Sequence, residues 1–303
     1  MVHRFWENSL INQTILAMTA HRRPIVAFFF PGRSNDRALV IGGVHGSELS
    51  AIEVVEHLIE TLHVGATLPH YNVIVIPHLF PDNAAVAEAH PEAIGSLANV
   101  GRYTAGSKVD PNRQFPALGR AFDPIQPIDA RGRPIEPENR LLLNLIQQFR
   151  PGRIATVHAI REPEMAGIFA DPRTDVAGRA LGFAPEARLA LAMAHRARQG
   201  GANVPANHLD SASPNAVYPL DPAVVAAGLP QPRQTDSGVS LGGWAAQAIA
   251  DIVQPQNSRQ ALTVITVEVQ TALRSADSAN PAIRRSELQA HSAAIHKIFL
   301  ANP

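Results

Sequence analysis

A histidine and a glutamate stand three positions apart within residues 38–48, Ala-Leu-Val-Ile-Gly-Gly-Val-His-Gly-Ser-Glu. The apolar run followed by two glycines predicts a buried strand that ends in a tight turn. On a turn that opens a helix, an imidazole and a carboxylate at this spacing can both reach one metal ion. Zinc takes this kind of nitrogen and oxygen ligation, which makes His45 and Glu48 candidate ligands.

Two further polar residues belong to other predicted strands. His158 ends the apolar run of residues 153–159, and Glu268 lies in the strongly β-like run of residues 262–269. Three protein ligands and an open fourth position suit a hydrolytic zinc ion, so His158 is the candidate third ligand. Glu268 has apolar neighbours, and a buried carboxylate needs a partner or a function. It is the candidate general base for the proton of a zinc-bound water molecule.

A histidine that binds a metal usually donates its other ring N–H to a carboxylate or a carbonyl group. Asp110 is the candidate for this supporting role. His78, which follows a proline break in another predicted strand, is a weaker candidate for an additional ligand. The chain has no cysteine, so any metal ion must be held by His, Asp or Glu side chains.

Strands that alternate with helices must position these residues. The spacing of apolar residues predicts strands over 25–30, 38–44, 72–79, 153–159 and 262–269, and helices over 49–62, 137–149, 185–199 and 241–253, with a last helix after Pro281. This alternation predicts one α/β domain over residues 1–303, with a twisted, mixed but mainly parallel central sheet flanked by helices. Ligands of such sheets bind at the carboxyl ends of the strands, where the candidate residues lie.

Three segments lack clear periodicity. Residues 1–23 are expected to form an N-terminal helix or an irregular lead-in, and residues 80–135 a functional loop region. Residues 160–237 are rich in proline and are expected to form a loop-rich segment that shapes substrate specificity, apart from the helix over 185–199.

Composition excludes several classes of function. The 303 residues include 26 Lys and Arg and 26 Asp and Glu, and this balance disfavours a nucleic-acid binder, which needs a basic surplus. No apolar run approaches the roughly 20 residues of a membrane helix. The first residues lack the apolar core of a signal peptide, so the expected location is the cytoplasm. The oligomeric state is not predicted.

Four motifs, taken in order, resemble those of the zinc metallocarboxypeptidases of the carboxypeptidase A type. They are His45–Glu48, Asp110–Pro116, Thr156–His158 and Thr266–Glu268. Smaller similarities are Pro81-Asp82-Asn83, Glu136-Pro137-Glu138 and the stretch Gly238–Trp244, so the resemblance spans about residues 24–300. It implies the carboxypeptidase (phosphorylase/hydrolase-like) fold and one Zn²⁺ per chain.

The resemblance also implies roles for residues that bind the substrate. Asn112 and Arg113 would hold a free carboxylate, for which a planar guanidinium and an amide are suited. Arg102 resembles the arginine that polarises the scissile carbonyl and stabilises the oxyanion. Arg120 is a weaker rival for either arginine. Proline at position 111 replaces the more usual leucine, and this fits only where no backbone N–H is needed.

One feature of the family has no clear counterpart. Many members carry a mobile tyrosine some twenty residues before the catalytic glutamate, whereas Ala245, Ala246 and Gln247 occupy that neighbourhood here. The nearest candidates are Trp244 and Tyr218, and the tyrosine's role stays unassigned.

The resemblance leaves more than one function open. Within the family the chain is most similar to the murein-peptide amidases, which cleave a γ-D-glutamyl–diaminopimelate bond. The run from Arg102-Tyr103 to Arg113 also resembles the N-acyl-amino-acid deacylases of the succinylglutamate desuccinylase and aspartoacylase type. Both functions imply a small peptide or acyl-amino-acid substrate with a free carboxylate. A non-catalytic binding protein with this fold is disfavoured, because the ligands and the glutamate are all present.

Overall fold

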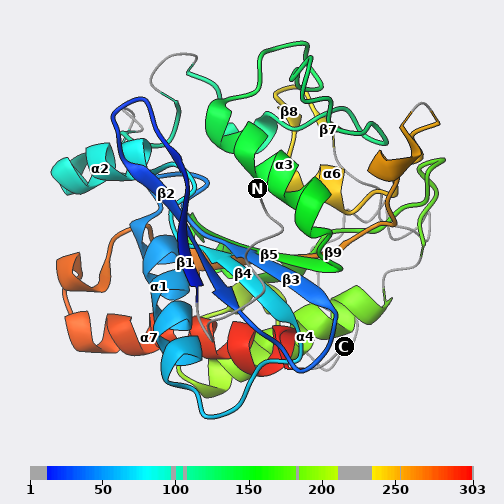
Figure 1. Cartoon of the computed structure of the whole chain (residues 1–303). Coiled ribbons are helices and arrows are strands. Elements are labelled where there is room, and N and C mark those ends of the chain that lie inside the picture. Colours follow the sequence, from blue (N-terminus) through cyan, green and yellow to red (C-terminus); the bar gives the residue numbers. More distant parts are fainter. Residues whose placement is uncertain are drawn as a thin grey trace.

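The computed structural model describes residues 12–96, 100–104, 108–181, 184–210, 234–252 and 254–301. In this part of the chain, seven strands form one sheet in the order β1-β2-β4-β3-β5-β9-β6 (Figure 1). They are β1 (Asn12–Met18), β2 (Pro24–Phe30), β3 (Arg37–Ile41), β4 (Asn72–Ile76), β5 (Arg153–Ile160), β6 (Gly167–Ala170) and β9 (Thr263–Gln270). A separate short hairpin consists of β7 (Gln234–Thr235) and β8 (Gly238–Val239).

The helices are α1 (Leu49–Val64), α2 (Pro81–Ala89), α3 (Pro137–Phe149), α4 (Ala184–Gln199), α6 (Leu241–Ala245) and α7 (Pro281–Ala294). The four central strands β4, β3, β5 and β9 are parallel, and β1, β2 and β6 add antiparallel pairs at the two sides. The predicted fold class, a mixed and mainly parallel sheet flanked by helices, is confirmed. Helix α1 forms a crossover, because it joins β3 to its parallel neighbour β4.

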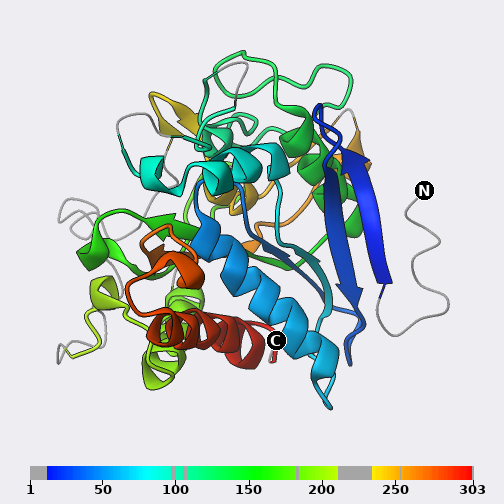
Figure 2. The ribbon, with the colours of Figure 1, turned by 90° about the vertical axis from the view of Figure 1, so that its left-hand side faces the viewer.

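Helices cover both faces of the sheet: α1, α4 and α7 lie on one face, and α3 and α6 on the other (Figure 1). Successive strand residues point to opposite faces. In β3, Ala38 and Val40 accordingly pack with the first group of helices, and Leu39 and Ile41 with the second. Figure 2 shows α1 and α7 side by side, with β1 and β2 at the edge of the sheet.

The N-terminal segment differs from the expected helix or irregular lead-in over residues 1–23. Residues 12–18 form β1, which pairs antiparallel with β2, whereas residues 1–11 lie outside the described part of the chain. An edge strand has hydrogen-bond partners on one side only and stays half exposed; Ile15, for example, is 58% exposed. Its sequence therefore lacks the buried apolar run that predicts a central strand.

Other predicted boundaries are wrong for similar reasons. The loop regions expected over 80–135 and 160–237 contain the short elements α2 and β6. The helix expected over 241–253 ends at Ala245, because the next residues pair with another segment: Ala246 O accepts the N–H of Thr174, and Ala248 N–H donates to Thr174 O. None of the helices in the described ranges has both the length and the apolar character needed to cross a membrane.

Candidate metal centre and active site

Strand alternation brings His158 and Glu268 together. The parallel strands β5 and β9 are in register with His158 opposite Glu268, near the carboxyl ends of both strands. Their neighbours Val157 and Val267 point to the opposite face and pack in the core beside α1, α4 and α7. The two polar side chains therefore share the face that carries α3 and α6.

His45 and Glu48 lie on the turn between β3 and α1. Gly46 is required there, because a Cβ atom at this position would lie 2.3 Å from the backbone nitrogen of Ala84 at the start of α2. This close approach fixes the turn against α2 and places Glu48 directly before α1. The neighbouring strand β5 carries His158 near its carboxyl end, close to Glu48.

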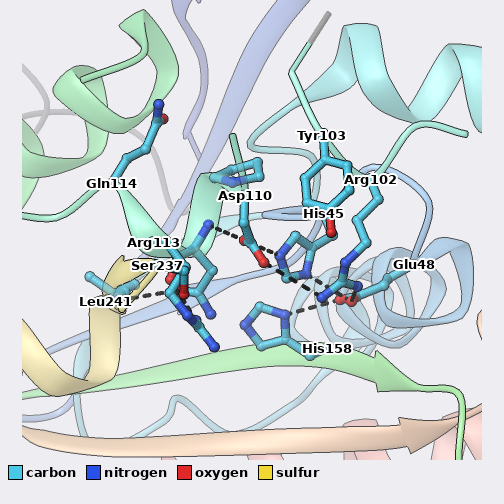
Figure 3. A network of polar contacts seen from close by, with 12 residues as sticks. His45, Glu48, Arg102, Tyr103, Asp110, Arg113, Gln114, His158, Ser237 and Leu241 are labelled. Carbon is cyan, nitrogen blue, oxygen red and sulfur yellow. Dashed lines mark hydrogen bonds and ion pairs between the residues drawn. The ribbon is translucent and has the colours of Figure 1, made fainter. Parts of the chain in front are cut away.

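The three candidate ligands form one buried cluster (Figure 3). Nδ1 of His45 lies 2.8 Å from Oε1 of Glu48, and Nδ1 of His158 lies 3.0 Å from Oε2 of the same carboxylate. Each residue offers one ligand atom, and these atoms all lie within 4.8 Å of one another. Two imidazole nitrogens and a carboxylate oxygen converge as zinc or a similar divalent ion requires, so the donor set fits a metal ion.

Electrostatics in the cluster favour a cation. Burial alone would raise the pKa of Glu48, but the two imidazoles beside it hold that pKa well below its usual range. Burial alone would lower the pKa of His45, but the charges of Glu48 and Asp110 raise it to about 9. The carboxylates thus stabilise positive charge at this place, whether a proton or a metal ion carries it.

Asp110 and Arg102 surround the cluster. Asp110 Oδ1 lies 2.7 Å from Nε2 of His45, the ring nitrogen that faces away from Glu48. Burial would raise the pKa of Asp110, but the hydrogen bond with His45 and the nearby positive charges lower it to about 2. Arg102 donates from Nη1 to Oε1 of Glu48 at 3.0 Å, and its Nη2 lies 3.7 Å from Oδ2 of Asp110. The structure thus brings both residues to the cluster.

Asn112 and Arg113 belong to a 3₁₀ turn, Pro111–Arg113, that packs against β8 and the residues after it. Asn112 Oδ1 accepts the backbone N–H of Leu241 at 3.0 Å. The buried Asn139 of α3, which the sequence analysis did not single out, donates from Nδ2 to the carbonyl of Pro111 at 2.8 Å. Proline fits position 111 because it stands at the first position of the turn, where no backbone N–H is needed.

One cavity of about 590 Å³ contains seven of the eight predicted site residues. They are His45, Glu48, Arg102, Asn112, Arg113, His158 and Glu268. A larger cavity of about 760 Å³ lies at the other end of β5 and β9, beside Gly152 and Leu262. Among the described residues that line it, none is His, Asp or Glu.

Several weaker candidates lie elsewhere. Nε2 of His78 lies 2.9 Å from Glu56, outside the cluster. Trp244 is 1% exposed, and its indole N–H donates to the carbonyl of Arg120, so neither residue lines the 590 Å³ cavity. Tyr218 lies outside the described residues. Tyr103, which the sequence analysis used only as a neighbour of Arg102, lies close to the network in Figure 3.

Burial raises the pKa of Glu268 from 4.5 to about 7, and this makes a prediction for stability. The folded chain holds this proton more tightly than the unfolded chain, so stability falls as the pH rises from about 4.5 to 7. We expect metal-free Glu268→Gln to exceed the unaltered protein in unfolding free energy by about 3 kcal/mol at pH 8 and by little at pH 4.5.

Urea unfolding of both chains in the presence of a chelator measures this difference. Glu164→Gln is the control, because Glu164 is exposed and lines no part of the cavity. Equal unfolding free energies of the Glu268→Gln and unaltered chains at pH 8 would contradict the assigned environment.

Comparison with models of known protein families and with curated protein sequences finds no match. Among solved structures, the chain is similar to carboxypeptidase A from Helicoverpa armigera, with 14% sequence identity and a TM-score of 0.54 over 94% of this chain and 69% of that one. It is also similar to a metallo-carboxypeptidase from Burkholderia cenocepacia, with 14% identity and a TM-score of 0.52 over 96% of this chain and 65% of that one. The resemblance of the motifs thus agrees with the architecture, and the chain has the fold of the metallocarboxypeptidases.

Proposed function

We propose that this protein is a zinc-dependent hydrolase that cleaves an amide bond next to a free carboxylate, as a carboxypeptidase does. The observation that supports it most is the convergence of His45, Glu48 and His158 in one cavity with Glu268. A hydrolytic metal site needs three protein ligands and a neighbouring base, and the cavity offers both. One Zn²⁺ per chain is part of the proposal. When bound, the ion would act as a Lewis acid that polarises the scissile carbonyl group.

Glu268 is the proposed general base. A base works best when its pKa lies near the operating pH, and burial raises the pKa of Glu268 to about 7. A bound cation would lower this value and increase the ionised fraction at neutral pH. Glu268 would take a proton from the attacking water molecule and pass it to the leaving amine.

Asp110 and Arg102 would prepare the site. Asp110 would keep the proton of His45 on Nε2, so that Nδ1 stays free for the metal ion. The guanidinium of Arg102 is held between Glu48 and Asp110, at the wall of the cavity. From there it would stabilise the negative charge that develops on the carbonyl oxygen.

Asn112 and Arg113 would bind the carboxylate of the substrate. Within the described residues, Arg113 forms no ion pair, and its Nη1 donates to the carbonyl of Asn112 at 2.7 Å. The other donors of its guanidinium therefore stay available for a carboxylate in the cavity. The amide of Asn112 is oriented because Leu241 N–H holds its oxygen, which leaves the Nδ2 donor for the substrate.

We expect Arg113→Ala to raise KM for substrates with a free carboxylate by roughly 10- to 100-fold, the scale of a lost hydrogen bond to a charged group. Steady-state kinetics on a peptide and on its C-terminal amide measure the effect. Arg120→Ala is the control, since Arg120 lies outside the cavity. Equal cleavage of acid and amide by the unaltered enzyme would contradict the role of Arg113.

The substrate class separates two forms of the proposal. The motif resemblance favours a murein-peptide amidase. A deacylase of the succinylglutamate desuccinylase and aspartoacylase type is the second candidate, favoured by the pair Arg102-Tyr103 in a run that resembles that group. We expect a panel of wall peptides and N-acyl amino acids to show cleavage of the peptides. Cleavage of small N-acyl amino acids alone would assign the chain to the second group.

A further inference from the structure

Two turns of the chain have the same sequence pattern and the same hydrogen bonds. In Asp129–Arg133 and Asp175–Arg179 the pattern is Asp-x-x-Gly-Arg. Oδ1 of each aspartate accepts the backbone N–H groups two and four residues later, at 2.8 and 2.9 Å. Oδ2 accepts Nε–H of the arginine, at 2.6 Å in the first turn and 2.7 Å in the second. The glycine has a φ of +76° in one and +78° in the other.

The two arginines differ in what else they contact. Nη2 of Arg133 donates to two backbone carbonyl groups, that of Arg113 at 3.0 Å and that of Ser237 at 2.8 Å. The side chain of Arg133 is 32% exposed. The side chain of Arg179 is 81% exposed, and within the described residues it bonds only to Asp175. The turn at Arg133 therefore bridges to other segments, whereas the turn at Arg179 does not in the described part of the chain.

The bridge joins two segments at the candidate carboxylate site. Gly238 packs so closely on Arg113 that a Cβ atom there would lie 2.1 Å from its carbonyl oxygen, and Gly238 has a φ of +136°. On the two sides of this contact, Leu241 N–H donates to Asn112 Oδ1 at 3.0 Å, and Phe115 N–H donates to Val239 O at 3.3 Å. The segment after β7 thus lies directly against the turn that carries Asn112 and Arg113.

Arg133 supplies a hydrogen-bond donor where the two segments meet. The carbonyl oxygens of Arg113 and Ser237 both carry partial negative charge, and one guanidinium nitrogen donates to both. The buried carboxylate of Asp129 holds the other side of that guanidinium through Nε. A planar group fixed at both ends has little freedom, so it can set the position of the backbone to which it bonds.

We propose that Arg133 is a positioning residue for carboxylate recognition, which holds the turn Pro111–Arg113 against the hairpin β7–β8. This inference rests on the proposed role of Arg113 in binding the substrate carboxylate. Asp129 balances the charge of the Arg133 side chain, so Arg133 would act by placing Asn112 and Arg113 and not through its own charge. When the two donor side chains are already held in place, binding a carboxylate does not carry the cost of ordering them.

The test compares Arg133→Gln with Arg179→Gln in the metal-loaded protein. Both variants remove the same aspartate–arginine contact from the same turn, but only the first removes the bridge to Arg113 and Ser237. We expect Arg133→Gln to raise KM for free-carboxylate substrates about tenfold, with kcat and metal content nearly unchanged. Arg179→Gln should leave KM unchanged. Equal KM values for Arg133→Gln and the unaltered enzyme would overturn the proposal.

A double-mutant cycle shows whether Arg133 acts through Arg113. In the Arg113→Ala background, the added Arg133→Gln change should raise KM less than twofold, because residues that act as one unit are not additive. The same tenfold rise in that background, or with amidated substrates, would mean that Arg133 affects the site as a whole and would overturn the proposal.

Binding measurements keep this test separate from the proposed function. Isothermal titration calorimetry with free amino acids as probes, which carry the carboxylate but have no amide bond to cleave, reports carboxylate recognition without turnover. If the unaltered metal-loaded protein binds none of these probes or their peptide counterparts, the proposed function fails. If it binds them and Arg133→Gln binds them equally well, the proposed function stands and the role of Arg133 fails.

Discussion

Protein with alanine in place of His158 is expected to purify without its metal ion and without activity. His158 supplies one of the three candidate ligands found in the described part of the chain, and its Nδ1 lies 3.0 Å from the carboxylate of Glu48. Loss of an outer partner of a metal ligand already weakens binding about 10–100-fold, and loss of a ligand itself should weaken it more. Elemental analysis after dialysis should find about one zinc ion per unaltered chain.

His78→Ala is the matched control for this experiment. His78 also follows a strand and also pairs with a glutamate, but its partner is Glu56 and it lies outside the cluster. This variant should keep its metal ion and its activity. Retention of metal by His158→Ala at the level of the unaltered chain would refute the ligand set and, with it, the metal-dependent mechanism.

Replacement of Glu268 by glutamine should remove turnover as well, but this variant should keep its metal ion. The amide keeps the shape of the side chain but cannot accept the proton. General-base catalysis contributes about 10²–10⁴-fold, so we expect kcat to fall by this factor, with little change in KM. Measurement of kcat beside metal content distinguishes this variant from His158→Ala.

Glu162→Gln is the control for Glu268→Gln. Glu162 lines the same cavity but is exposed at its rim, so its replacement should change kcat little. A Glu268→Gln enzyme with a kcat near that of the unaltered chain would rule out Glu268 as the base.

The sequence predicts the centre of the site better than its surroundings. His45, His158 and Glu268 follow from a rule of architecture, since parallel strands bring their carboxyl ends to one edge of the sheet. The apolar neighbours of Glu268 in the sequence also predict its partial burial, because they reflect a strand covered on both faces. These properties depend on local pattern and on chain order, which a sequence displays directly.

Other features depend on contacts between distant segments, which no local pattern displays. The Asp-x-x-Gly-Arg pattern at Arg133 and that at Arg179 are equally visible in the sequence, yet only Arg133 reaches Arg113. The partners of Arg133 are backbone carbonyl groups, which every residue has and no residue type marks. The edge strand β1 and the early end of α6 are of the same kind, because both depend on pairing with another segment.

The pairing of β5 with β9 has a consequence for how such a chain can change in evolution. His158 and Glu268 face each other across neighbouring strands, so their separation follows from the spacing of strands in any sheet, about 4.8 Å. Insertions or deletions between the strands leave that distance untouched, whereas a slip of one residue within either strand would turn one side chain to the wrong face. Loops between the two strands can thus lengthen, shorten or acquire new side chains while the proposed ligand and the proposed base keep their mutual geometry. In the proposed mechanism, substrate preference can therefore change without a change in the geometry of the hydrolytic groups.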